Sequence, residues 1–93
     1  MKKKNLLFIV VDCLRADKCY GPHKSAKTPT IDMLRRKGTT FLNAITSSTL
    51  TVPSIASVLT GTYPFLHGIR SHIELGTLNP NVTTIAEFLK QKG

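Results

Sequence analysis

The chain opens with an apolar run that has no polar interruption. Residues 6–11 are all apolar, and the run ends directly at Asp12. A short continuous run of this kind is typical of a central strand in a parallel sheet that helices cover on both faces. The pattern predicts a second strand over residues 40–46, whereas residues 13–28 form a polar connection too irregular to assign.

Between the two predicted strands lies a segment with strong helix signals. Thr28 suits the N-cap, and Pro29 suits the first helical position, where its missing N–H costs nothing. Asp32 falls in the first turn and three basic residues fall in the last, as the helix dipole favours. The helix is predicted to end at Gly38, acting as the C′ residue.

Two further helices are predicted in the second half. One begins near Pro53, carries an apolar stripe and ends at Gly61. The other begins at Thr84, which forms a capping box with Glu87. Residues 62–82 are predicted to be a long connection between them.

This order of elements is the opening of an α/β fold with a mostly parallel sheet between helices. Two strands do not make a sheet that three helices can cover. We therefore expect the 93 residues to be the N-terminal piece of a larger domain.

Composition limits the functional classes. Hydrophobic residues make up 41% and charged residues 19%, as in ordinary globular proteins. Thirteen lysines and arginines against five acidic residues give a net charge of +8, mostly carried by the first half. Such a basic half suits nucleic acid, anionic lipid or a small anionic substrate, and charge alone does not choose among them.

The two cysteines and the amino terminus bear on location. Cys13 and Cys19 are too few for a disulfide framework and lack zinc-site spacing, so we expect reduced thiols in a cytoplasmic protein. The run 6–11 is shorter than the roughly 7–15 apolar residues of a signal peptide. No stretch reaches the roughly 18–20 apolar residues of a membrane span, so we expect a soluble, unprocessed chain.

Asp12 is the first candidate for chemistry. It follows the first predicted strand directly, and ligands of open α/β sheets bind at that edge. A carboxylate there is suited to hold a divalent cation. The alternative is an aspartate that caps the following turn through the backbone.

Thr51 is the second candidate. It lies at the mouth of the helix that begins near Pro53, where free N–H groups favour an anion. With a metal ion nearby, its hydroxyl is a candidate nucleophile toward phosphorus or sulfur. The alternative is that Thr51 or Ser54 is only an N-cap.

A set of short motifs runs along nearly the whole chain: Asn5 to Asp12, Leu14 to Asp17, Cys19 to Gly21, Thr28 to Leu34, Thr40 to Ala44, Thr51 to Ser54, Leu59 to Pro64, His67-Gly68 and Thr84 to Lys90. In residues, order and spacing this set resembles the sulfatase-type enzymes of the alkaline phosphatase superfamily.

The resemblance implies a fold and two site residues. The fold would be a three-layer α/β sandwich like that of alkaline phosphatase, with residues 1–93 as the N-terminal fragment of its catalytic domain. Asp12 would be a metal ligand, and Thr51 would be the nucleophile that also touches the metal. The cofactor would be a divalent ion: calcium, zinc, magnesium or manganese.

Three positions depart from the sulfatase pattern. Sulfatases place Cys or Ser at the position of Thr51 and convert it to formylglycine, an aldehyde. Oxidation of a threonine would give a ketone, so formylglycine cannot form here. Ile55 stands at an arginine position, and Cys13 stands where many sulfatases have a second metal-binding aspartate. Phosphodiesterases and phosphoglycerol transferases of the superfamily use an unmodified threonine, which favours transfer at phosphorus.

The sequence therefore predicts part of a metal-dependent hydrolase or transferase that acts on phosphate-type or sulfate-type esters. Its partners would be an anionic ester and the rest of the catalytic domain. We expect the 93 residues alone to be inactive, because one carboxylate and one hydroxyl do not complete a divalent site. Two alternatives remain: a small basic nucleic-acid-binding module, disfavoured by the lack of Trp and of zinc ligands, and an inactive truncated remnant.

Two histidines flank Arg70 after the Thr51 helix. His67 and His72 could contact an anionic substrate or bind metal. We predict a structural role for His67, which matches the His-Gly turn of the family.

Overall fold

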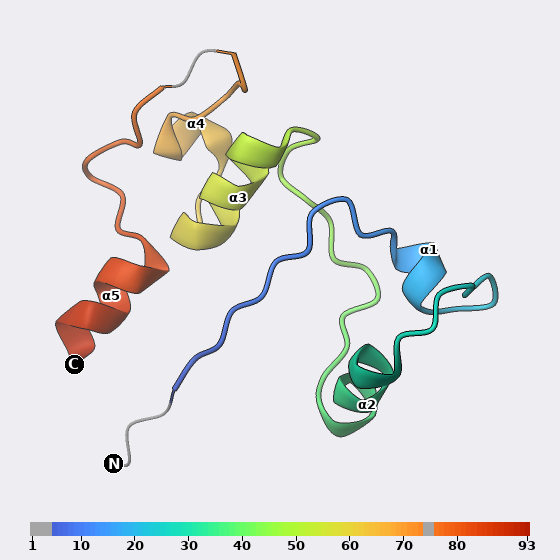
Figure 1. Cartoon of the computed structure of the whole chain (residues 1–93). Coiled ribbons are helices and arrows are strands. Elements are labelled where there is room, and N and C mark those ends of the chain that lie inside the picture. Colours follow the sequence, from blue (N-terminus) through green and yellow to red (C-terminus); the bar gives the residue numbers. More distant parts are fainter. Residues whose placement is uncertain (1–4, 74–75) are drawn as a thin grey trace. The chain divides into compact units, whose positions relative to one another are not determined.

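The computed structural model describes residues 5–73 and 76–93, and the chain divides into two compact units, Met1–Leu42 and Asn43–Gly93 (Figure 1). None of the helices in these ranges has the length and apolar character needed to cross a bilayer. The first unit contains α1 (Ala16–Cys19) and α2 (Pro29–Lys37); the second contains α3 (Thr51–Thr60), α4 (Pro64–His67) and α5 (Ile85–Lys92).

Helix α2 confirms the predicted helix, with differences at both ends. Pro29 is its first residue, and the N–H of Gly38 donates to the carbonyl of Leu34 at 2.8 Å. Gly38 is extended, with φ −122°, rather than left-handed as the C′ assignment implied. Thr28 is the N-cap, but its side chain does not cap the helix.

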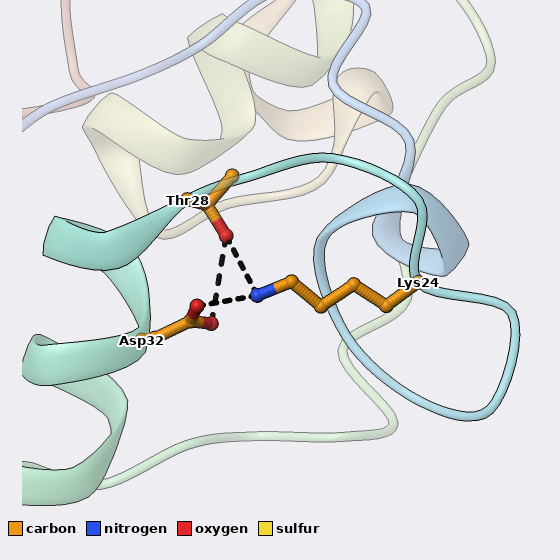
Figure 2. Close-up of polar contacts among 3 residues, drawn as sticks. All are labelled: Lys24, Thr28 and Asp32. Carbon is orange, nitrogen blue, oxygen red and sulfur yellow. Dashed lines mark hydrogen bonds and ion pairs between the residues drawn. The ribbon is translucent and has the colours of Figure 1, made fainter.

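The Thr28 hydroxyl instead joins a cluster that fastens the preceding loop to α2 (Figure 2). Lys24 Nζ donates to Thr28 Oγ1 at 3.0 Å and forms an ion pair with Asp32. Thr28 Oγ1 in turn donates to Asp32 Oδ1 at 3.5 Å. The hydrogen bond from Lys24 is the main cause that lowers the pKa of Asp32, against an opposing effect of desolvation.

Helix α1 forms inside the segment left unassigned by the sequence pattern. Cys19 at its end is buried, and the N–H of Ala26 donates to the carbonyl of Lys18 at 3.0 Å. The Arg35 guanidinium of α2 lies 4.8 Å from the centre of the Tyr20 ring, a cation–π contact. Side-chain contacts that no local pattern shows therefore organise this segment.

The second unit confirms two predicted helices and adds a third. Helix α3 ends at Gly61, which has the left-handed φ of 65° that glycine adopts at low cost. The capping box of α5 is present: the N–H of Glu87 donates to Thr84 Oγ1 at 3.3 Å, and that of Thr84 donates to Glu87 Oε2 at 2.8 Å. Helix α4, which begins at Pro64, lies within the predicted connection.

The two predicted strands are not formed, and the described residues contain no strand. The side chains of residues 6–11 are 51–82% exposed, and residues 40–46 adopt turns and irregular backbone. A strand pairs its N–H and C=O groups only with a neighbouring strand, whereas a helix pairs them within itself. The described residues therefore show neither predicted strand, and the three-layer sandwich stays a prediction.

The Lys24 cluster predicts a specific change in titration. Replacing Lys24 with Met removes the main hydrogen bond to Asp32, so the pKa of Asp32 should rise toward its ordinary value of 3.8. Because the folded pKa is lowered, the stabilisation that the ionised carboxylate gives is present above pH 3.8 and lost as the pH falls below it. Carboxyl ¹³C NMR across this range measures the shift. The exposed Lys27→Met variant is the charge-matched control, and an unmoved Asp32 titration in Lys24→Met would contradict the assignment.

Candidate functional site

Asp12 lies in an exposed turn of the first unit. It follows the extended segment 5–11, and its Oδ2 accepts a weak hydrogen bond from Cys13 Sγ at 3.6 Å. Cys13 has φ 58°, a left-handed conformation uncommon for residues other than glycine. The carboxylate of Asp12 is thus open to solvent. The two cysteines are free thiols, Cys13 exposed and Cys19 buried.

Thr51 is the first residue of α3 in the second unit, and it is exposed. The N-cap is Leu50, so the alternative in which Thr51 or Ser54 is the N-cap is wrong. Ser54 Oγ donates instead to the carbonyl of Thr51 at 3.0 Å. The backbone N–H of Thr51 donates to Nε2 of His72 at 3.1 Å. A first-turn N–H has no intrahelical acceptor, so this imidazole supplies one.

The ring of His67 is fully buried beneath this helix. Its Nδ1 accepts a hydrogen bond from the N–H of Ile69 at 3.1 Å, which assigns the proton of the neutral ring to Nε2. Nε2 then donates to Ser57 Oγ of α3, 2.9 Å away. The structural role predicted for His67 agrees with this placement.

The segment after α4 is tied to the same histidine. The N–H of Asn79 donates to the carbonyl of His67 at 2.9 Å, and its side-chain amide donates to the carbonyl of Leu66 at 3.0 Å. Main-chain and side-chain hydrogen bonds therefore connect α3, α4 and Asn79. This network holds the helix that carries Thr51.

An apolar groove runs along α3 in the second unit. Its volume is about 420 Å³. Most of its lining is aliphatic, and Thr51 is one of its few hydroxyl residues; the lining is Thr51, Val52, Ile55, Ala56, Leu59, Thr60, Ile69, Leu78 and Thr84. Thr51 therefore borders a groove whose walls are mostly apolar and offer few groups that could bind an ion.

The described residues do not form a complete metal site. Asp12 belongs to the first unit and Thr51 to the second. Across residues 5–73 and 76–93 there is no group of three or more His, Cys, Asp or Glu side chains placed to hold a metal. Structural zinc takes four ligands and calcium six to eight, so the Asp12 carboxylate is at most one contributor.

Comparison with known proteins identifies the family. The sequence model of the Sulfatase family matches residues 4–93. The chain belongs to the sulfatase family. A rat steryl-sulfatase is 36% identical over 100 residues, which cover 96% of this chain and 17% of that protein. The human arylsulfatase K is 31% identical over 93 residues, covering 99% of this chain and 17% of that protein.

A bacterial relative is named after the whole alkaline phosphatase superfamily. The multifunctional alkaline phosphatase superfamily protein PehA of Trinickia caryophylli is 42% identical over 73 residues, covering 72% of this chain and 14% of that protein. The chain thus spans less than a fifth of the length of these relatives. No solved structure matches.

Family membership confirms the resemblance inferred from the motifs. It implies an alkaline-phosphatase-like fold and a divalent metal ion for the sulfatase family as a whole. The sequence named His72 as a candidate contact for an anionic substrate or a metal, and in the structure of this sulfatase-family chain its Nε2 accepts from the backbone N–H of Thr51, 21 residues away. No local pattern reports such a contact.

The buried imidazole generates a stability prediction. His67→Ala leaves the Ile69 N–H buried without an acceptor and opens a cavity, which should lower the free energy of unfolding by about 2–4 kcal/mol. Ser57→Ala should cost less, about 1 kcal/mol, because it removes one hydrogen bond. Urea denaturation followed by circular dichroism measures both. The exposed His23→Ala variant is the control, and equal midpoints for His67→Ala and His23→Ala would refute the role given to the network.

Proposed function

We propose that this chain supplies the nucleophile of a sulfatase-family enzyme that hydrolyses or transfers phosphate-type esters. One observation carries the proposal: Thr51 is exposed at the first position of the ten-residue helix α3. The dipole at that end of a helix stabilises negative charge, while the N–H of Thr51 itself is engaged by His72. A tetrahedral anionic ester is thereby attracted to the residue that attacks it.

The identity of residue 51 supports chemistry at phosphorus. The aldehyde of formylglycine forms from Cys or Ser, and threonine would yield a ketone. Thr51 therefore acts as an alcohol. Ile55, one turn further along α3, provides no positive charge where sulfatases carry an arginine.

The reaction proceeds in two displacements. Thr51 Oγ1 attacks the phosphorus, an O–P bond forms, and the bond to the leaving alcohol breaks. The proton of the threonine hydroxyl passes to a base, and the alkoxide leaving group takes up a proton. A second alcohol or a water molecule then attacks the phosphothreonine and releases Thr51.

Sulfate esters are the second candidate substrate. The names of the steryl-sulfatase and arylsulfatase relatives favour it, and sulfate esters share the tetrahedral anionic form of phosphate diesters. The two candidates differ in the atom attacked, so turnover of matched aryl esters separates them.

Asp12 is proposed as a ligand of the divalent ion that family membership implies. The remaining ligands of the site would come from the rest of an alkaline-phosphatase-like catalytic domain, of which residues 1–93 form a part. The residues described supply no complete site, so no step of the reaction is assigned to the ion. A cytoplasmic location stays a prediction.

The nucleophile prediction uses the intact protein and two aryl esters, a phosphodiester and a sulfate. Thr51→Ala should reduce phosphodiester turnover by at least about a thousandfold, because no other group replaces the attacking oxygen. Thr51→Ser keeps a hydroxyl and should retain measurable turnover. Thr49→Ala, a neighbouring exposed threonine outside α3, is the control.

Each result decides between the candidates. Full activity in Thr51→Ala would refute the nucleophile. Sulfate turnover that Thr51→Ala abolishes, with no phosphodiester turnover, would replace the first candidate by the second. A wild-type protein inactive on both esters would favour the inactive remnant.

The metal prediction concerns Asp12. Asp12→Asn should raise the divalent ion concentration needed for half-maximal binding by at least about tenfold. Replacing even a residue that only hydrogen-bonds to a metal ligand lowers metal affinity by about ten- to a hundredfold. Isothermal titration of the metal-free intact protein with calcium, zinc, magnesium or manganese measures it. Asp17→Asn is the control, because that carboxylate is exposed and pairs with Arg15 at 2.9 Å. Unchanged metal affinity in Asp12→Asn would show that Asp12 only occupies a turn.

A further inference from the structure

The start of α3 lacks a cap from its own sequence. Leu50 is the N-cap, and a leucine side chain has no hydrogen-bond acceptor. The acceptor for the N–H of Thr51 comes instead from Nε2 of His72, at 3.1 Å and 21 residues further along the chain. Since Nε2 accepts, the proton of the neutral ring lies on Nδ1.

The other long helices begin differently. Helix α5 is capped by its own Thr84 within a capping box, and α2 begins with Pro29, which has no N–H to satisfy. Helix α3 has neither arrangement, and its first residue is the proposed nucleophile. The contact with His72 is therefore made at the peptide whose orientation sets the position of the attacking oxygen.

We propose that His72 is a positioning residue, which fixes the first turn of α3 so that Thr51 Oγ1 points in one direction. This inference rests on the function proposed above for Thr51. The imidazole acts through the backbone N–H of Thr51 and need not touch the substrate. Without it, the first turn frays, as helix ends without caps do. Small displacements of a reacting group lower the rate of the chemical step more than the affinity for the substrate.

The test compares two substitutions of His72 with a control in the intact protein. His72→Ala removes the acceptor. His72→Gln keeps one, because the glutamine amide oxygen can reach the place of Nε2. His23→Ala removes an exposed histidine of the other unit. Two quantities are measured in each variant: the hydrogen-exchange rate of the Thr51 amide by NMR, and kcat and KM on the aryl ester that the wild-type protein turns over.

The expected results follow from the loss of one cap. His72→Ala should speed exchange of the Thr51 amide and lower kcat about five- to tenfold, with KM within about twofold. His72→Gln should restore most of both, and His23→Ala should change neither.

Two results would overturn the proposal. Equal exchange rates of the Thr51 amide in the wild type and in His72→Ala would show that the contact with His72 does not hold the first turn of α3. The second result is a Thr51 amide that stays protected in His72→Gln while kcat is as low as in His72→Ala. It would show that His72 affects catalysis in some way other than by positioning Thr51. Failure of the proposed function is seen separately, as full turnover by Thr51→Ala, while the exchange rates still decide whether His72 holds Thr51.

Discussion

The buried imidazole of His67 is the interaction on which the second unit depends. It has no exposed surface, and both ring nitrogens are engaged, one by the N–H of Ile69 and the other by the hydroxyl of Ser57. The main-chain carbonyl of His67 accepts a third hydrogen bond, from the N–H of Asn79. Because a polar ring is buried at little cost only when its hydrogen bonds are made, these bonds form together and fix α3, α4 and the following segment in one arrangement.

That arrangement also holds the helix that begins with Thr51. Ser57 anchors the middle of α3 to His67, and His72, five residues beyond His67, reaches the first residue of the helix. The same short connection thus holds the helix at its centre and at its N-terminal end. Two histidines of one short connection therefore contact the helix that begins with Thr51.

The first unit is organised by cations. Lys24 joins the loop to the first turn of α2 through Thr28 and Asp32, and Arg35 packs on the ring of Tyr20. Part of the basic excess of the first half thus serves local structure and is not a free surface for an anionic partner. The apolar residues 6–11 of this unit remain exposed.

Sequence alone determined helices α2, α3 and α5, the family, and the position of Thr51 near a helix start, but neither α1 nor α4. Capping residues, Pro29 and Gly61 act within a few residues of the turns that they begin or end, and a helix closes its hydrogen bonds within itself. The strands expected at 6–11 and 40–46 are not formed in the structure, and strand pairing depends on backbone groups that can lie far away in sequence. Only the tertiary structure decided that His72 contacts Thr51 and that His67 is buried against Ser57, since side chains 10 and 21 residues apart leave no periodic signal.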